Sequence, residues 1–98
     1  MSILNIKNEI SSLISTKYAG RFNEDIESSI AADMTQILVK YQKAAQINNF
    51  SNVTVKKMSD IIVKSRVVKS YTNTVKIRAA IYPSFVGSII KFDFDVRL

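Results

Sequence analysis

The most regular pattern in this chain is SIIKFDFDVRL, residues 88–98, in which apolar and charged side chains alternate. The apolar positions are Ile90, Phe92, Phe94 and Val96, and the charged positions between them are Lys91, Asp93, Asp95 and Arg97. Because successive side chains of a β-strand point to opposite faces, the stretch predicts a strand with one apolar and one ionic face. Such a strand is also suited to pair with the sheet edge of a neighbouring molecule. The residues predicted to carry this inter-subunit pairing are Ser88, Ile90, Phe92, Phe94, Val96 and Leu98.

A second alternating stretch, residues 74–82, precedes the first and predicts its hairpin partner. Its inward residues are Val75, Ile77, Ala79 and Ile81. Residues 83–87, which start with proline, supply the turn. The outward residues of the two strands are Lys76 and Arg78 on one and Asp93 and Asp95 on the other. Cross-strand ion pairs between them would help to fix the register of the hairpin.

The middle of the chain is less regular. Asn48 and Asn49 make a break, after which residues 52–57 predict a first strand. The apolar residues of this region are Phe50, Val53 and Val55. Residues 61–68 are rich in β-branched side chains but are interrupted by Lys64, Ser65 and Arg66, so this segment is either a further strand or an extended arm.

Helical spacing of apolar residues dominates the first half of the chain. Residues 3–18 predict a helix, with Ser2 as N-cap and Gly20 as stop. Its apolar residues are Ile3, Ile6, Ile10, Leu13 and Ile14. Residues 23–46 predict a longer helix, capped by Asn23 and followed by acidic residues that favour the positive end of its dipole. Its apolar stripe consists of Ile26, Ile30, Met34, Ile37, Leu38, Tyr41 and Ala45.

These elements predict one α+β domain over residues 1–98. Its parts are an N-terminal helix (residues 1–20), a long amphipathic helix (21–47) and a sheet with a C-terminal hairpin (50–98). We expect the two helices to pack on one face of a mostly antiparallel sheet of three to four strands that ends in the β-hairpin.

The side chains that most catalytic sites need are missing from this chain. It contains no histidine and no cysteine, which removes Ser-His and Cys-His nucleophiles and the commonest metal ligands. Gly20 and Gly87 stand alone, so no glycine-rich phosphate loop exists. Asp93 and Asp95 lie between basic residues, which favours a surface ion-pair ladder over a metal site. The sequence therefore predicts no enzyme, no metal site and no cofactor.

The net charge of +6 is unevenly distributed. Residues 1–49 hold five basic and five acidic side chains, whereas residues 50–98 hold nine basic and three acidic ones. This excess indicates either an acidic partner or the solvated outer faces of strands. The candidate basic surface consists of Lys56, Lys57, Lys64, Arg66, Lys69, Lys76 and Arg78. Basic strands with interleaved tyrosines can bind single-stranded nucleic acid, but the expected hairpin ion pairs would occupy part of this charge.

The order of the predicted elements is itself informative. A long helix (residues 22–47) is followed by a strand (52–57), a linker and a hairpin with the sequence NTVKIRAAIYPSFVGSIIKFDFDV (73–96). This order resembles the C-terminal domain of contractile-tail sheath proteins, whose closing hairpin also has a proline-containing turn and an aliphatic and aromatic final strand. Small baseplate proteins that initiate the sheath are similar over the same elements. They usually carry a Glu-Pro-Arg turn where this chain has Asn48-Asn49-Phe50.

The resemblance implies a structural assembly protein of a contractile phage-type tail, either in the sheath or in the baseplate as a sheath initiator. In such tails, arms and terminal strands of neighbouring subunits add to each other's sheets. Here that implies residues 88–98 as the terminal strand and residues 61–71 as a linker or arm. The implied partners are copies of the chain or other tail subunits, and the implied location is a virion tail assembled in the host cytoplasm.

Two alternatives from other functional classes stay open at this point. One is a small basic module that binds nucleic acid, and the other is a toxin or inhibitor acting on one host protein. No run of apolar residues approaches the roughly 20 that a transmembrane helix needs, so we expect no membrane span.

Overall fold

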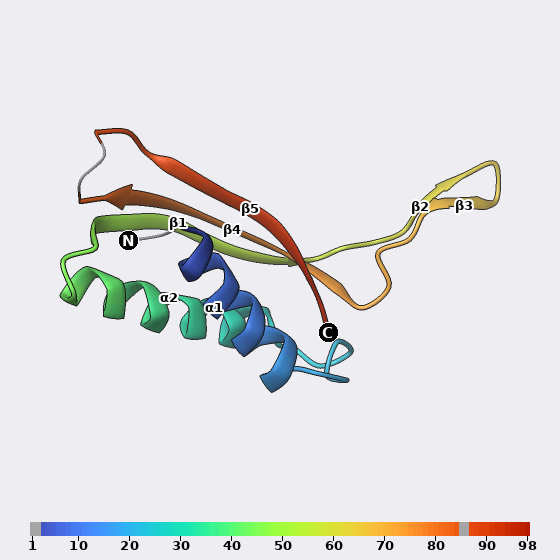
Figure 1. Ribbon diagram of the computed structural model, residues 1–98. Coiled ribbons are helices and arrows are strands. Elements are labelled where there is room, and N and C mark those ends of the chain that lie inside the picture. The colour runs from blue at the N-terminus through green and yellow to red at the C-terminus, as the bar shows by residue number, and fades with distance from the viewer. Residues whose placement is uncertain (1–2, 85–86) are drawn as a thin grey trace.

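The computed structural model describes residues 3–84 and 87–98, which form two helices on one face of a three-stranded antiparallel sheet, with a small hairpin set apart (Figure 1). The helices are α1 (Ile3–Lys17) and α2 (Glu27–Lys43). The sheet consists, in spatial order, of β1 (Ile47–Lys57), β4 (Thr74–Pro83) and β5 (Ile90–Arg97). The hairpin consists of β2 (Ile61–Val63) and β3 (Arg66–Lys69). The predicted α+β fold is therefore confirmed.

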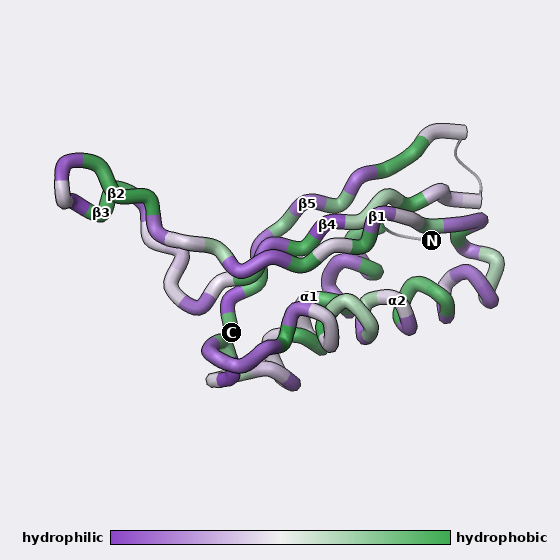
Figure 2. Tube along the Cα trace, turned by 180° about the vertical axis from the view of Figure 1, so that it is seen from behind, coloured by the Kyte–Doolittle hydropathy of each residue, from purple (hydrophilic) through white to green (hydrophobic). Residues whose placement is uncertain are grey.

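The core lies between the sheet and the helices, because α2 packs along β1 while α1 packs against α2 and β5. Apolar and polar residues alternate along β5 (Figure 2), and the apolar side chains of Phe92, Phe94 and Val96 are buried in the core. The core includes Ile6, Ile10, Ile14, Ile30, Met34, Leu38, Val75, Ile77, Ile81, Phe92, Phe94 and Val96. Leu13, predicted to share the apolar face of the first helix, is instead 37% exposed. In the described part of the chain the opposite face of the sheet carries no helix (Figure 1).

The predicted C-terminal hairpin is present. β4 and β5 pair without interruption, residues 74–81 running opposite residues 97–90. β5 begins at Ile90, not at Ser88, and Pro83 is the last residue of β4 instead of the first residue of the turn. The predicted turn at 83–87 also includes residues 85 and 86, which lie outside the described residues.

The outward side chains of this hairpin make the predicted ion pairs. Lys76 Nζ lies 3.1 Å from Asp93 Oδ1 and 3.4 Å from Asp95 Oδ1, while Arg78 Nε lies 3.3 Å from Asp93 Oδ2. The hydrogen bond between Lys76 and Asp93 raises the pKa of the lysine and lowers the pKa of the aspartate. These pairs fix the register of β5 on β4 by charge as well as by apolar burial.

β1 begins at Ile47, earlier than predicted, and it is irregular. Its pairing with β4 shifts between Ser51 and Thr54, where one extra residue is accommodated. Asn52 adopts a positive φ of 56° at this point, which is a conformation that β-bulges use. The bulge explains why Phe50 and Val53, three residues apart, both pack against the core. A second shift follows Ile47, so this edge of the sheet is interrupted twice.

The predicted ends of the second helix are wrong. Asn23 lies in a turn, and α2 starts at Glu27 after Ile26, whose side chain is buried in the core and makes no capping hydrogen bond. At the other end, Ala45 adopts a positive φ of 58°, and its N–H donates to the Gln42 carbonyl. The N–H of the next residue donates to the Tyr41 carbonyl, which completes a Schellman motif.

Three residues with predicted roles in the two helices need separate comment. Ala45 is exposed because it closes the helix instead of continuing its apolar stripe. Gly20 has the positive φ of 71° expected of a stop, although α1 already ends at Lys17. The predicted cap Ser2 lies outside the described residues.

Residues 61–69 form the segment that the sequence left open as a strand or an arm. They fold into the β2–β3 hairpin, which projects from one end of the sheet (Figure 1). The loop residues Lys64 and Ser65 both have positive φ, at 52° and 60°, as a two-residue type I′ turn requires. The Cα radius of gyration is 14.9 Å, whereas a compact chain of this length has about 12.5 Å. We call residues 61–69 the arm.

The turn of the arm is an unfavourable site for non-glycine residues, and this gives a first testable prediction. Ser65→Gly should stabilise the hairpin locally by about 1 kcal/mol, because glycine adopts positive φ without steric penalty. Hydrogen exchange of the arm amides should slow roughly fivefold while the melting temperature of the domain stays within a degree or so. Unchanged exchange in the arm would contradict the positive φ of Ser65.

Candidate interaction surfaces

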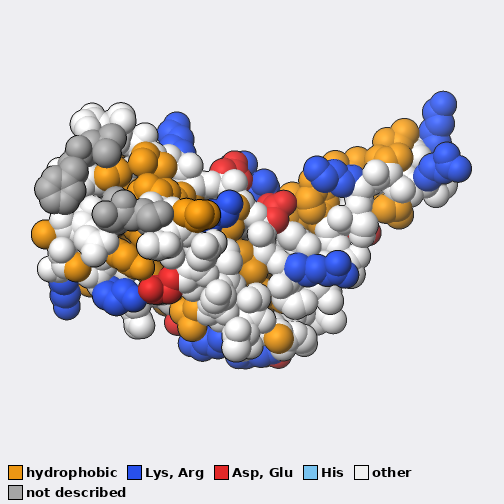
Figure 3. Space-filling view, in the orientation of Figure 1, with side chains coloured by type: hydrophobic (Ala, Val, Ile, Leu, Met, Phe, Trp, Pro, Cys, Tyr) orange, Lys and Arg blue, Asp and Glu red, His pale blue; other side chains and the backbone are white. Residues whose placement is uncertain are grey.

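The arm exposes a group of aliphatic side chains that nothing in the described chain covers. Between 47% and 62% of each side chain is accessible in Ile61, Ile62, Val63, Val67 and Val68. In the space-filling view they form an apolar stretch that ends in basic side chains at the tip (Figure 3). Over residues 3–84 and 87–98, neither β2 nor β3 contacts any other helix or strand. Because an isolated two-stranded hairpin is marginally stable in water, the arm is a poor free-standing unit and a good candidate for a contact.

Hydrogen bonds join the two chain segments that connect the arm to the sheet. The Met58 N–H donates to the Thr74 carbonyl at 2.9 Å, and the Tyr71 N–H donates to Asp60 Oδ1 at 2.5 Å. Lys69 Nζ lies 5.1 Å from the centre of the Tyr71 ring, and a hydrogen bond with that side chain raises the pKa of Lys69. Specific contacts therefore hold together the two segments that connect the arm to the sheet.

β5 is the second candidate, because it forms an edge of the sheet as far as the structure describes the chain. The Leu98 N–H donates to the Asn73 carbonyl at 2.8 Å. In a regular antiparallel ladder this turns the main-chain groups of Arg97, Asp95 and Asp93 away from β4. β5 has no bulge in its pairing, so its edge is a better template for an added strand than the twice-interrupted edge of β1.

The residues predicted for inter-subunit pairing take different positions around β5. Phe92, Phe94 and Val96 are at most 8% exposed and pack in the core of their own chain. Ile90 is half-buried, Ser88 precedes the strand and Leu98 follows it. Only the main chain of β5 and its outward charged side chains can therefore meet a neighbour.

The candidate basic residues do not form one surface. Lys56, Lys76 and Arg78 share the helix-free face of the sheet, and two of the three are already paired with aspartates. Lys57 points to the other face, where its Nζ donates to the Glu24 carbonyl at 2.7 Å. The remaining members, which lie on the arm, are Lys64, Arg66 and Lys69. This dispersal weakens the case for a continuous nucleic-acid track.

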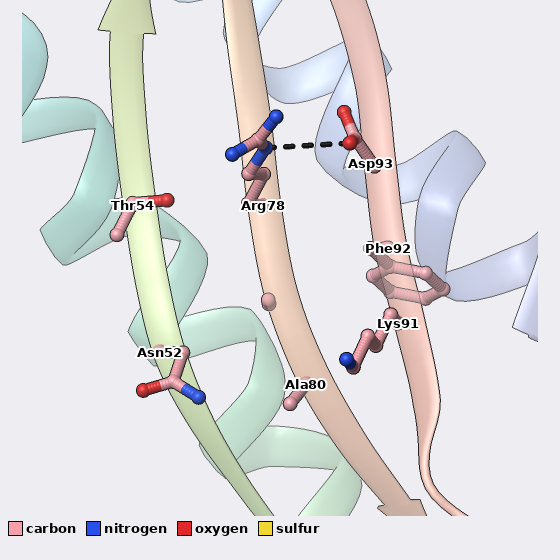
Figure 4. A pocket seen from close by; sticks show the side chains of 8 residues that line it. Asn52, Thr54, Arg78, Ala80, Lys91, Phe92 and Asp93 are labelled. Carbon is pink, nitrogen blue, oxygen red and sulfur yellow. Dashed lines mark ion pairs between the residues drawn. The ribbon is translucent and has the colours of Figure 1, made fainter.

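The helix-free face of the sheet has an open hollow of about 520 Å³ (Figure 4). Ala80 lies at its floor, and Asn52, Arg78 and Lys91 lie around it. The Arg78 side chain pairs with Asp93 on the neighbouring strand, which leaves its charge compensated (Figure 4). In the part of the chain that the structure describes, no cluster of acidic residues is arranged to hold a metal ion.

Sequence reasoning did not include the aliphatic residues of the arm among the site residues. The available signal was a run of β-branched residues without alternation, Ile61-Ile62-Val63 and Val67-Val68, around a polar loop. Such a run is apolar on both strand faces, whereas a strand with one solvated face would alternate. In a segment that does not enter the sheet, it indicates a surface that something else covers.

Comparison of this chain with models of protein families, with curated proteins and with solved structures finds no match. The likeness to tail sheath proteins therefore rests on the sequence pattern alone. Neither described helix is long and apolar enough to cross a membrane.

Proposed function

We propose that this protein is a structural assembly subunit of a contractile phage-type tail, in the sheath or the baseplate, and that it associates with copies of itself through exposed β-structure. The observation that carries the proposal is the arm, an aliphatic hairpin in solvent that contacts no other helix or strand of the described chain. Contiguous exposed apolar surface of this kind marks interaction sites in soluble proteins. The uninterrupted edge of β5 offers a second point of contact.

The element order of the chain supports the tail context. The arm occupies the linker position between the first strand and the closing hairpin, where the resemblance to sheath proteins implies an inter-subunit element. The location that goes with this proposal is a virion tail assembled in the host cytoplasm. The lack of histidine and cysteine favours this structural role over a catalytic one.

The proposal is tested by light scattering of the purified protein over a wide concentration range. The wild type should form dimers or larger species, and replacing Ile62 and Val67 together by threonine should weaken association at least about tenfold. Threonine keeps the β-branched shape that suits a strand and removes only apolar surface. Because the two residues face each other across the hairpin, both apolar contributions on that face are removed.

Ile89→Thr is the matched control, because this isoleucine is also half exposed but lies outside the arm. Its association should equal that of the wild type. A wild type that stays monomeric, or a double variant that assembles normally, would overturn the proposal.

The same experiment with a single-stranded oligonucleotide tests the nucleic-acid alternative. For an assembly protein, the measured mass should not depend on the oligonucleotide at physiological salt. A monomer that binds the oligonucleotide and releases it steeply as salt increases would favour the alternative.

A further inference from the structure

The outer edge of β2, extended by Asp60 before it and by the turn residue Lys64 after it, has a sequence that matches itself when reversed. Residues 60–64 read Asp-Ile-Ile-Val-Lys, with an acidic residue at one end, a basic residue at the other and aliphatic residues between. If two copies of this edge run antiparallel and are centred on Ile62, Asp60 of each copy lies opposite Lys64 of the other. Ile61 then lies opposite Val63, and Ile62 lies opposite its own counterpart. Each position meets a partner of complementary chemistry.

The main chain of β2 is oriented for the same pairing. Val63 and Arg66 flank the two-residue loop, and residues in that position form a hydrogen-bonded pair across a hairpin. The N–H and C=O groups of the next residue, Ile62, therefore point away from β3. A partner strand centred on Ile62 would receive two main-chain hydrogen bonds there, in the register that the side chains favour.

The other edge of the arm does not have these properties. Antiparallel pairing of two β3 strands would place Arg66 opposite Lys69 of the second copy, which is a repulsive contact at both ends. β3 also contains an extra residue, because the register shifts between Ile61 opposite Lys69 and Ile62 opposite Val67. A bulge of this kind interrupts the hydrogen-bonding edge.

We propose that the arm's partner is the arm of a second copy of this chain, and that the two β2 strands pair antiparallel across a twofold axis at Ile62. The inference rests on the proposed function, since it names the partner of the surface on which that function depends. The product is a four-stranded sheet in the order β3-β2-β2-β3, which exceeds the three strands that a small sheet needs for stability. Because the arms run in opposite directions, the bodies lie at opposite ends of this sheet.

Charge reversal at the two ends of the edge tests this register. In Lys64→Asp homodimers two aspartates face each other at both ends, and in Asp60→Lys homodimers two lysines do. Each variant alone should associate at least about fivefold more weakly than the wild type. In an equimolar mixture, each Asp60→Lys chain would place lysine opposite aspartate of a Lys64→Asp chain at both ends. Sedimentation equilibrium of the mixture should therefore recover heterodimers with near wild-type affinity.

Local folding of the hairpin does not explain these outcomes. Aspartate tolerates positive φ better than lysine, so Lys64→Asp should leave the turn intact or stabilise it. Restoration by mixing also cannot arise from a defect within one chain. Asp60→Lys does remove the acceptor of the Tyr71 N–H, which makes the mixture the decisive sample.

Disulfide formation between single introduced cysteines tests the position of the proposed twofold axis directly, because the chain has no cysteine of its own. Residues in a hydrogen-bonded antiparallel pair have Cα atoms about 5.5 Å apart, within the range of a disulfide. Ile62→Cys should therefore form disulfide-linked dimers at least about tenfold faster than Val67→Cys, a matched site of similar exposure on β3.

The outcomes separate this inference from the proposed function. Wild-type association that depends on the arm but ignores the charge reversals, or a mixture no tighter than its components, would overturn the β2 pairing and leave the assembly function standing. A wild type that shows no self-association would overturn both.

Discussion

Phe94→Ala should lower the free energy of unfolding by about 3–5 kcal/mol, the range measured for truncation of buried aromatic residues. Phe94 is 8% exposed, and its ring packs edge-on against Phe92 with centroids 6.0 Å apart. Lys7 of α1 places its ammonium group 5.2 Å from the ring centre. The total free energy of unfolding of a small domain is about 5–15 kcal/mol, so the variant should lose a large part of its stability.

Urea denaturation followed by circular dichroism measures this effect. The midpoint should fall while the denaturant dependence stays unchanged, which separates lost stability from a change in the unfolded chain. Ile62→Ala is the control, because it removes aliphatic surface from a side chain that is 62% exposed. Its unfolding free energy should change by no more than about 0.5 kcal/mol. Equal effects of the two substitutions would contradict the burial of Phe94.

This difference matters for tests of assembly. The apolar face of β5 is the core face of its own chain, so a loss of oligomers in Phe94→Ala would follow from unfolding. The arm behaves in the opposite way. Its aliphatic residues contact no other helix or strand of the described chain, so they contribute little to the stability of the rest of the domain. Substitutions in the arm therefore test association with little effect on folding.

Patterns that repeat over many residues predicted most of the fold. The alternation of residues 90–97 has a period of two, and it gave the strand, its buried face and its ion pairs with Lys76 and Arg78. The apolar stripe from Ile26 to Tyr41 similarly predicted the face that α2 buries. The free energy gained by burying this face is larger than the preferences of single residues for other conformations.

Local features were harder to predict, since single residues decide them and tertiary contacts override their preferences. Asn23 is a good capping residue, yet the chain buries Ile26 in the core and starts the helix after it. The bulge at Asn52 inserts one residue into β1, and no periodic pattern contains an irregularity of this kind. The hairpin at residues 61–69 uses a Lys-Ser turn where Asn-Gly is the usual signal, so the sequence does not distinguish a strand from an arm there.

The contact between the two helices also escaped sequence reasoning, although the sequence contains a repeated signal. Each of the two Lys-Tyr pairs, at residues 17–18 and 40–41, binds one carboxylate of the other helical segment. Lys17 and Tyr18 bind Asp33, with distances of 3.0 Å from Nζ and 2.6 Å from the phenol oxygen to Oδ2. The second pair binds Glu9 in the same way, which fastens α1 antiparallel to α2 at two levels.

Burial would by itself raise the pKa of Asp33, but the hydrogen bonds from Tyr18 and Lys17 outweigh it and hold that pKa below its usual value. Burial raises the pKa of Tyr18, so its hydroxyl stays protonated and donates a hydrogen bond to the Asp33 carboxylate. A carboxylate whose pKa is lower in the folded chain stabilises folding above the unfolded-state pKa. That contribution disappears as the pH falls through the folded-state pKa.

Asp33→Asn should therefore reduce the free energy of unfolding by about 2 kcal/mol at pH 7, the range for hydrogen bonds that involve a charged group. Asparagine has nearly the same size and helix propensity as aspartate, so the change removes mainly the charge. The difference from the wild type should be constant well above the unfolded-state pKa of aspartate, about 3.9. It should shrink as the pH falls below that value, because the unfolded chain then takes up a proton before the folded chain does. Denaturation midpoints collected across these pH values measure it.

Glu9→Gln is the matched control, because Glu9 makes the same two kinds of contact but its side chain is 36% exposed, compared with 15% for Asp33. Solvent screens the exposed pair, so this substitution should lower the unfolding free energy by about 0.5 kcal/mol or less. If the two variants lost equal stability, burial would not be the reason that the Asp33 contact is strong. A difference between wild type and Asp33→Asn that persisted unchanged at pH 2 would show that the carboxylate charge is not what the asparagine lacks.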